Sequence, residues 1–420
     1  MALKGSATIE LTDSQGNKEV YKEDNIITNA VQDLLNTNLN GQIIPSRFFP
    51  LKNFFSGVLL MDSNIEERAD ITTIPSGVEV LGHAGSETNT TINTLKGSIN
   101  LTETQELNNG YKFVWDFSNT QGNGIIKSIC LTHLKAGNDN LYNNIVTDVS
   151  TYDSDKDWSS DVNYITSIDF ENGILYVCKK DSSTTNITIH KYSHNFLSFG
   201  INDIYSSTKL IETKIISGTT IGTIKSELSF SDGRDGYLYG FYAPRKASGD
   251  TVLNIIRISK SDFSYTEKSI TLTDVQLYLP NSFYYVNACP IKDGFIYLLD
   301  YKTKSTFYKM NLTDETDIKL LESDNKKQLI SSEGSSFALI GDTLYSKYVT
   351  IFNDKVREIS KNLIGDAYCI HSYKNYLIRF YSYSVIGYLN GILTTVNNLS
   401  TPIEKTTDKT MKITYIITEA

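Results

Sequence analysis

DGYLYGFYA, residues 235–243, places an Asp-Gly turn directly before a run of aromatic and aliphatic residues. Four other stretches follow the same pattern: NGILYVCKK (172–180), DGFIYLLDY (293–301), GDTLYSKYV (341–349) and KNYLIRFYS (374–382). Most of them lead through a polar turn into another strand-like segment, such as VLNIIRIS at 252–259. Turn residues before aromatic and β-branched runs predict strands, and repetition of one small unit predicts a repeat architecture.

The repeated units lie within residues 146–396. One small sheet cannot bury both of its faces alone, so repeated sheets stack on one another. A propeller blade takes about 40–50 residues, so this region has room for five or six blades. We therefore predict a β-propeller. A plain multi-sheet β-domain, in which the strands resemble one another by chance, is the alternative.

The two ends of the chain follow a different pattern. Residues 6–11 and 18–22 alternate around turn residues and predict a hairpin, and Asn29 is a candidate N-cap for a short helix ending near residue 36. Further strands are predicted at 56–61, 95–101 and 111–117, and residues 410–418 alternate as a final strand. The chain is thus expected to be all-β. Residues 1–145 and 397–420 would form a β-sandwich with one short helix, and the propeller of 146–396 would be inserted into it.

Composition excludes several classes of partner. The formal net charge is −9, and no cluster of five Lys or Arg residues occurs, which argues against a nucleic-acid partner. No apolar stretch reaches the length of a membrane helix, so we expect no membrane insertion, and the N-terminus lacks the apolar core of a secretory signal. The four cysteines are widely spaced and are expected to be free and buried.

A glycine-containing loop in FVWDFSNTQGNGIIKSICLTH, residues 113–133, raises the question of a phosphate site. A phosphate loop needs a following helix that begins with Lys and Ser or Thr, whereas an apolar strand follows here. Asn123-Gly124 is a hairpin signal, because both residue types tolerate positive φ. The sequence therefore predicts a β-hairpin at this point.

The same stretch resembles tail and baseplate proteins of phages and phage tail-like particles of low-GC Gram-positive bacteria. The matching residues include Trp115, Asp116, Phe117, Gln121, Asn123 and Gly124. KEDNIITNAVQDLL (22–35), FSGVLLMDSNIEE (55–67) with VLGHAG (80–85), and KTTDKTMKITYIITE (405–419) are similar to further segments of such proteins, in the same order. The resemblance covers about 160 residues at the two ends and does not extend into the repeats.

The resemblance implies a virion tail component, a tail fibre or receptor-binding protein. It would assemble in the host cytoplasm, be released by lysis, and form a homotrimer bound to other tail or baseplate proteins. The ends would attach to the particle, and the propeller would bind a host cell-wall or surface glycan. Two other classes stay open: a purely structural baseplate protein without a ligand, and a glycan-degrading tail enzyme.

The candidate glycan-binding side chains lie in the repeats, because tyrosine offers a rigid apolar face that ends in a hydroxyl group. They are Tyr237, Tyr239, Tyr242, Tyr284, Tyr285, Tyr301 and Arg245. For any single tyrosine, packing between blades is the competing interpretation.

No catalytic residue is predicted, because no nucleophile-elbow motif occurs. Asp235, Asp293, Asp300 and Asp342 could in principle supply a glycosidase pair, but turn aspartates usually accept backbone N–H bonds. We expect no cofactor. The only weak metal candidate is a calcium-loop spacing at Asp153, Asp155, Asp157 and Asp161, in which Trp158 and Tyr164 replace the expected Gly and Glu.

Overall fold

The computed structural model shows an all-β protein. The residues that it describes are 3–32, 51–75, 77–137, 145–148, 161, 164–180, 185–194, 208–221, 228–279, 287–323, 336–346, 349–358, 369–373, 376–381, 384–389 and 392–419. The chain divides into two compact units. The first contains the described residues within Met1–Asn40, Arg47–Ile145 and Leu389–Ala420, and the second those within Val146–Tyr388.

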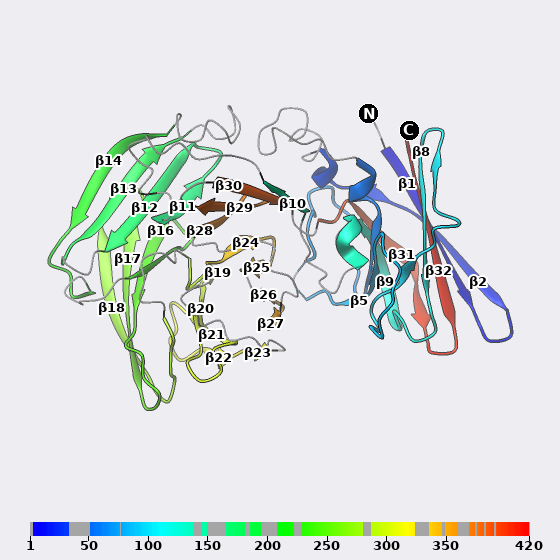
Figure 1. The fold of residues 1–420 in the computed structure, drawn as a ribbon. Coiled ribbons are helices and arrows are strands. Elements are labelled where there is room, and N and C mark those ends of the chain that lie inside the picture. The colour runs from blue at the N-terminus through cyan, green and yellow to red at the C-terminus, as the bar shows by residue number, and fades with distance from the viewer. Residues whose placement is uncertain are drawn as a thin grey trace. The chain divides into compact units, whose positions relative to one another are not determined.

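One sheet of the first unit brings the two ends of the chain together. Its strand order is β2 (Lys18–Asp24), β1 (Leu3–Thr12), β32 (Thr410–Glu419), β8 (Gly110–Phe117) and β6 (Ser98–Ile99), with β7 (Gln105–Leu107) also paired to β8. The predicted hairpin at 6–11 and 18–22 is confirmed as the antiparallel pair β1–β2. The final strand lies between β1 and β8, antiparallel to both (Figure 1).

The second sheet of this unit has the order β3 (Ile26–Ile27), β31 (Thr395–Lys405), β9 (Gly124–Thr132), β4 (Gly57–Met61) and β5 (Val80–Ala84). The inward faces of both sheets contribute to one hydrophobic core, which includes Trp115 and Tyr415 from the first sheet and Val58 and Ile129 from the second. Strand β31 begins at Thr395, and Thr394 already donates to the Leu131 carbonyl. The first unit therefore resumes at Leu389 rather than at the expected residue 397.

Helix is scarce in the described residues. Residues 29–32 are helical, which places the start of the predicted helix at Asn29, while the remainder of that segment lies outside the described residues. Two short 3-10 turns, η1 (Leu51–Phe54) and η2 (Leu134–Gly137), complete the helical elements.

The predicted hairpin at Asn123-Gly124 is wrong. Strand β8 pairs with β32, whereas β9 pairs with β4 and β31, so residues 118–123 carry the chain from one sheet to the other. The glycines do supply the expected backbone freedom, with φ +62° at Gly122 and +139° at Gly124. A tight turn is therefore present, but the strands on its two sides do not pair with each other.

The second unit contains five separate sheets (Figure 1, green to red). Three consecutive sheets are β11 (Ile165–Asp169), β12 (Ile174–Lys180), β13 (Ile187–Ser193) and β14 (Lys209–Ile216); β15 (Ser229–Asp232), β16 (Tyr237–Tyr242), β17 (Thr251–Ser259) and β18 (Tyr265–Leu272); and β19 (Ile291–Lys292), β20 (Phe295–Leu299), β21 (Phe307–Asn311) and β22 (Ile318–Leu320).

The other two sheets are less regular. One contains β24 (Ala338–Ile340), β25 (Thr343–Tyr345), β26 (Val349–Phe352) and β27 (Lys355–Glu358), with β23 (Glu322–Ser323) parallel to β27. The other has the order β10 (Ile145–Asp148), β30 (Ser384–Leu389), β29 (Tyr376–Tyr381) and β28 (Cys369–Tyr373). Its strands come from the two ends of the repeat region.

The repeated motif in the sequence corresponds to a repeated structural position. Each of the five quoted stretches contains one strand that is second from the edge of its sheet: β12, β16, β20, β25 and β29. The glycines of four of these stretches have positive φ: Gly173, Gly236, Gly294 and Gly341. Glycine adopts this left-handed conformation without the steric cost that a Cβ imposes, which explains its recurrence at these turns.

Neighbouring sheets share hydrophobic clusters. One cluster joins β11–β14 to β15–β18, a second joins β15–β18 to β19–β22, and a third joins β19–β22 to the β24–β27 sheet. The sequence of strand β16 is continuously apolar because its two faces pack into different clusters. Leu238 belongs to the first cluster, and Tyr239 and Phe241 belong to the second. Both faces of such a strand are buried.

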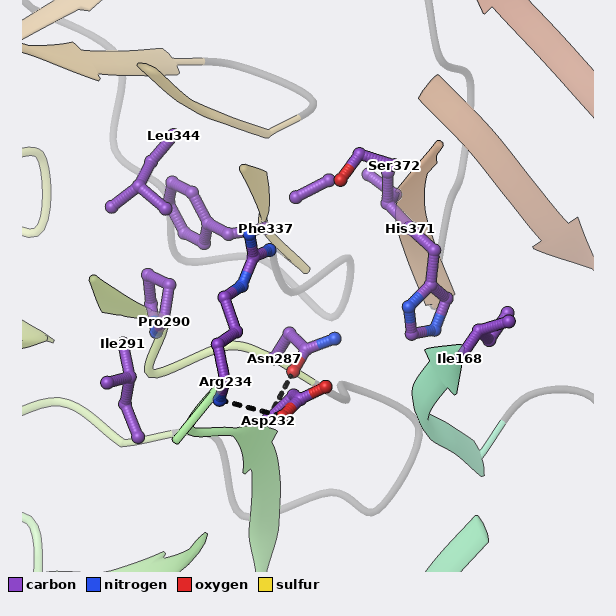
Figure 2. A pocket seen from close by; sticks show the side chains of 12 residues that line it. Ile168, Asp232, Arg234, Asn287, Pro290, Ile291, Phe337, Leu344, His371 and Ser372 are labelled. Atoms are coloured by element: carbon purple, nitrogen blue, oxygen red, sulfur yellow. Dashed lines mark hydrogen bonds between the residues drawn. The ribbon is translucent and has the colours of Figure 1, made fainter. Parts of the chain in front are cut away.

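Hydrogen bonds connect the remaining sheet to its two neighbours. Ser372 of β28 donates its hydroxyl to the Leu339 carbonyl of β24 at 2.5 Å, and His371 Nε2 lies 2.8 Å from the Ile165 carbonyl of β11. A cavity of about 180 Å³ is lined by residues in or beside the edge strands β11, β15, β19, β24 and β28 (Figure 2). We call it the five-sheet cavity.

Candidate functional site

Three of the candidate tyrosines belong to strand β16 and are held by other residues. Tyr239 is only 6% exposed, its ring stacks on Phe241, and its hydroxyl donates to Asp235 Oδ2 at 2.7 Å. Burial, followed by this hydrogen bond, raises the pKa of Tyr239. Tyr237 is covered by the Arg257 guanidinium, 3.4 Å from the ring centroid, and Tyr242 packs at the margin of a core cluster. Tyr239 is therefore a core residue, whereas Tyr237 and Tyr242 are partly exposed beside the core clusters.

The other candidates separate into two groups. Tyr284 and Tyr285 lie outside the described residues. Tyr301 and Arg245 are brought to one surface, together with Tyr278 and Lys304, which the sequence did not single out. We call these four residues the tyrosine-pair surface.

The tyrosine-pair surface is a continuous series of cation and ring contacts. The guanidinium carbon of Arg245 lies 3.9 Å from the Tyr278 ring centroid, and the Tyr278 and Tyr301 centroids are 6.1 Å apart with their planes tilted by 30°. Lys304 Nζ lies 5.4 Å from the Tyr301 centroid. Arg245 is exposed, and the other three side chains are partly exposed. Both aromatic rings are thus bordered by a cation.

Backbone pairing fixes the two tyrosines beside each other. Leu277 and Asp300 form an antiparallel bridge, Tyr278 N–H donates to the Leu299 carbonyl at 2.8 Å, and Tyr301 N–H donates to the Gln276 carbonyl at 2.9 Å. Tyr278 comes directly after Leu277 and Tyr301 directly after Asp300, so main-chain hydrogen bonds on both sides of the bridge hold the two tyrosines.

A tight turn positions Lys304. The buried Asp300 carboxylate accepts the Thr303 N–H at 2.7 Å, and Lys304 N–H donates to the Asp300 carbonyl at 3.0 Å. Lys304 has φ +55°, a left-handed conformation that the turn imposes. At the other end of the series, Arg245 Nε and Nη2 donate to the Leu279 carbonyl at 3.4 and 3.3 Å. The geometry of the surface is thus set by main-chain contacts.

The aspartates considered for catalysis have structural partners. Asp235 accepts the Tyr239 hydroxyl and the Tyr237 N–H, and Asp300 accepts the Thr303 N–H. Asp342 Oδ1 lies 3.5 Å from Lys292 Nζ, and Asp293 lies in a turn with φ +52° and is largely exposed.

Of the four calcium candidates, only Asp161 lies within the described residues. Its buried carboxylate contacts Lys179 Nζ, accepts the Tyr192 hydroxyl at 2.6 Å, and lies 2.5 Å from His190 Nδ1. Hydrogen bonds and the Lys179 charge lower the pKa of Asp161, although burial, the largest single influence, opposes them. Its carboxylate oxygens are thus engaged by protein donors. The described part of the chain contains no cluster of three or more His, Cys, Asp or Glu side chains arranged to hold a metal ion.

The family-motif residues have structural positions in the first unit. Trp115 is fully buried and donates its indole N–H to the Gly85 carbonyl at 3.1 Å, while Asp116 accepts from Asn100 Nδ2 at 2.8 Å. The Phe117 ring lies against glycines, and a Cβ built on Gly97 would lie 2.7 Å from it. These residues serve the core and the turn that leaves it.

Lys405 closes the turn at 118–123. Its buried amine donates to the Ser118 carbonyl at 2.9 Å and to Asn123 Oδ1 at 2.7 Å, and Gln121 Oε1 accepts the Ser118 N–H at 2.9 Å. Burial lowers the pKa of Lys405 to about 8. The turn and β31, far apart in the sequence, are thereby joined through one side chain.

No protein-family model matches the chain, and no curated protein sequence matches it. No helix within the described ranges is long and apolar enough to cross a membrane.

Proposed function

We propose that this protein is a tail or baseplate component of a phage or phage tail-like particle, and that it binds a host cell-surface glycan. In this proposal the first unit is a β-sandwich that attaches to the particle, and the second is a five-bladed β-propeller that recognises the host. The resemblance of the ends to tail proteins motivates the attachment role. The tyrosine-pair surface supports the glycan-binding role.

The shared core of the first unit supports the sandwich. Two sheets contribute their inward faces to one hydrophobic cluster, as the layers of a sandwich do. The motif residues Trp115 and Phe117 are buried in that cluster, so the resemblance to tail proteins lies in the scaffold of the unit.

The cyclic order of contacts supports the propeller. Hydrophobic clusters join the first four sheets in succession, and hydrogen bonds of β28 join the last sheet to both the fourth and the first. Edge strands of all five sheets line one cavity, as the inner strands of blades surround an axial channel. Pairing of β10 with β30 would then close the ring with strands from both ends of the repeat region.

The observation that carries the glycan-binding function is the tyrosine-pair surface. Two partly exposed rings at 6.1 Å, bordered by Arg245 and Lys304, combine apolar faces with charged donors. Sugars present apolar C–H faces that stack on such rings and hydroxyl groups that accept from cations. The rings are positioned before binding by the Leu277–Asp300 bridge, which reduces the entropy lost on association.

Valency would strengthen weak binding at each surface. A homotrimer carries three copies, and linked sites raise the apparent affinity without any new contact. The net charge of −9 repels a polyanionic polymer over about 10 Å at 0.1 M salt, so a neutral or zwitterionic glycan is the preferred ligand.

A glycan array probed with the intact protein tests the proposal. We expect binding that is lost in Tyr278→Ala and Tyr301→Ala and kept in Tyr265→Ala, a matched control whose tyrosine is 42% exposed on β18. Truncating a stacking aromatic should weaken binding by about 1–3 kcal/mol, roughly tenfold to a hundredfold.

The same preparation distinguishes the two alternative functions. Release of reducing sugar from host envelopes would identify a glycan-degrading enzyme. Absence of any binding to glycans or envelopes by an intact, correctly folded oligomer would identify a purely structural baseplate protein.

A further inference from the structure

An arginine whose side chain has no hydrogen-bond or ion-pair partner among the described residues lines the five-sheet cavity. Arg234 follows β15, and its side chain extends between Pro290, Phe337 and Leu344 on one side and His371 and Ser372 on the other (Figure 2). Within the described part of the chain, its guanidinium makes no hydrogen bond or ion pair. Water reaches the Arg234 side chain. Desolvation by the surrounding protein atoms lowers its pKa, whereas the negative charges of Asp232 and Asp293 raise it. A guanidinium has several N–H donors, and here they lie in a solvent-accessible cavity with no hydrogen-bond acceptor among the described residues.

The backbone holds Arg234 in this position at a cost. Its φ is +59°, a left-handed conformation that Gly or Asn would adopt more readily than arginine. The conformation is fixed because Arg234 N–H donates to Asp232 Oδ1 at 2.8 Å and Asp232 N–H donates to Asn287 Oδ1 at 3.0 Å. Strained backbone that the surrounding contacts hold in place is found most often at functional sites.

The carboxylate of Asp232, which lines the cavity, is already neutralised. Asp232 accepts from Lys260 Nζ at 2.6 Å and from the Ser167 hydroxyl at 2.5 Å, and Lys260 Nζ also reaches Ser167 Oγ at 2.9 Å. Asp232 and Lys260 are each about a fifth exposed, so this ion pair is partly shielded from water. Because Asp232 pairs with Lys260, it does not neutralise the positive charge of Arg234.

The described residues of the opposite wall add no negative charge. His371 is buried, and burial lowers its pKa to about 4, so the imidazole is neutral near pH 7. Ser372 donates its hydroxyl to the Leu339 carbonyl, and the remaining lining residues near Arg234 are Pro290, Phe337 and Leu344. Among the described lining residues, Arg234 is thus a cation without a charged partner, which favours the binding of an anion.

We propose that the five-sheet cavity binds an oxyanion, a carboxylate or a phosphate group, through the Arg234 guanidinium. The planar fork of arginine matches such groups with two parallel hydrogen bonds. A volume of about 180 Å³ equals that of about six water molecules in the liquid. The cavity therefore has room for a small anion or an acidic monosaccharide.

This site is independent of the tyrosine-pair surface. Arg234 precedes β16 and Arg245 follows it, so the two arginines lie at opposite ends of a six-residue strand, roughly 20 Å long at the usual rise. Either site can fail experimentally without affecting the conclusion about the other.

Calorimetric titration of the intact protein with phosphate and with glucuronate, at constant ionic strength, tests the oxyanion site. Glucose serves as the neutral control for glucuronate, and chloride as the control for phosphate. We expect Arg234→Gln to weaken binding by about tenfold to a hundredfold, as loss of hydrogen bonds to a charged group does. Arg234→Lys should bind with intermediate affinity, because it keeps the charge but loses the fork. Arg257→Gln, which removes an equal charge from the Tyr237 contact, should bind as the wild type does.

Phenylglyoxal labelling of the wild-type protein gives a second measurement that needs no variant. The bound oxyanion should slow modification of Arg234 and leave the rate at Arg257 unchanged, as measured by mass spectrometry of the peptides. Protection by glucuronate alone would identify a carboxylate ligand, and protection by phosphate alone a phosphate ligand. Equal binding of glucose and glucuronate, unchanged binding in Arg234→Gln, or no protection by either anion would overturn the proposal.

Discussion

Ending the chain at Lys405 should unfold the first unit, because strand β32 occupies the middle of its sheet. The strand contributes an inward row of four side chains, each no more than 2% exposed: Met411, Ile413, Tyr415 and Ile417. Burial of one such side chain contributes about 1.5–3 kcal/mol, so the row contributes roughly 6–12 kcal/mol. The net stability of a domain is about 5–15 kcal/mol. Truncation therefore removes an amount comparable to the whole stability of the unit.

The truncation also leaves the backbone groups of β1 and β8 unpaired along ten and eight residue pairs, respectively. Exposed edges of this kind associate with other chains, so we expect aggregation as well as loss of a melting transition. Light scattering and calorimetry measure the two effects. Ile413→Ala should cost about 2–5 kcal/mol, whereas Thr414→Ala on the outward face should change stability by less than about 0.5 kcal/mol. A truncated protein that stays soluble with unchanged melting would show that β32 contributes nothing to the core.

Three further variants test single contacts. Because the folded pKa of His371 is about 4 and the unfolded value is about 6.5, only the unfolded chain gains a proton between these pH values. Stability should therefore fall by up to about 3 kcal/mol as the pH drops through that window, and denaturant titrations of His371→Gln should lack this component. Gly97→Ala should cost about 1–3 kcal/mol by thermal unfolding, because its Cβ would meet the Phe117 ring at 2.7 Å. The pKa of Lys405 is about 8 in the folded protein and about 10.4 in the unfolded chain, so between these pH values only the unfolded chain holds the proton. The free energy of unfolding should therefore rise as the pH increases from about 8 to about 10.4. Lys405→Met should lose that rise, and an identical slope in both proteins would contradict the assigned shift.

The sequence predicted local structure better than connections between sheets. The alternation at 410–418 was sufficient to predict β32 and its buried face, because a period of two specifies both. The Asn123-Gly124 signal described a turn but could not specify which sheet β9 would join. Backbone preferences at a turn contain no information about long-range pairing, which depends here on contacts with β4 and β31.

The candidate site was predicted only in part, for a similar reason. Tyr301 and Arg245 lie on the tyrosine-pair surface, but Tyr239 is a core residue whose partner, Asp235, lies in its own preceding turn. Tyr278 lies between two leucines, and its exposure depends on the Leu277–Asp300 bridge, which no local pattern reveals. Arg234 did carry a signal, since an arginine stands within the glycine-rich turn SDGRDG at 231–236.

Binding of the intact protein to cell envelopes from a panel of low-GC Gram-positive bacteria tests the central claim most directly. We expect the wild type and Tyr265→Ala to bind envelopes of at least one host equally well. Tyr301→Ala, with the same oligomeric state and melting temperature, should lose most of this binding. If Tyr301→Ala and Tyr278→Ala together bind that host as the wild type does, the tyrosine-pair surface is not the receptor-binding site.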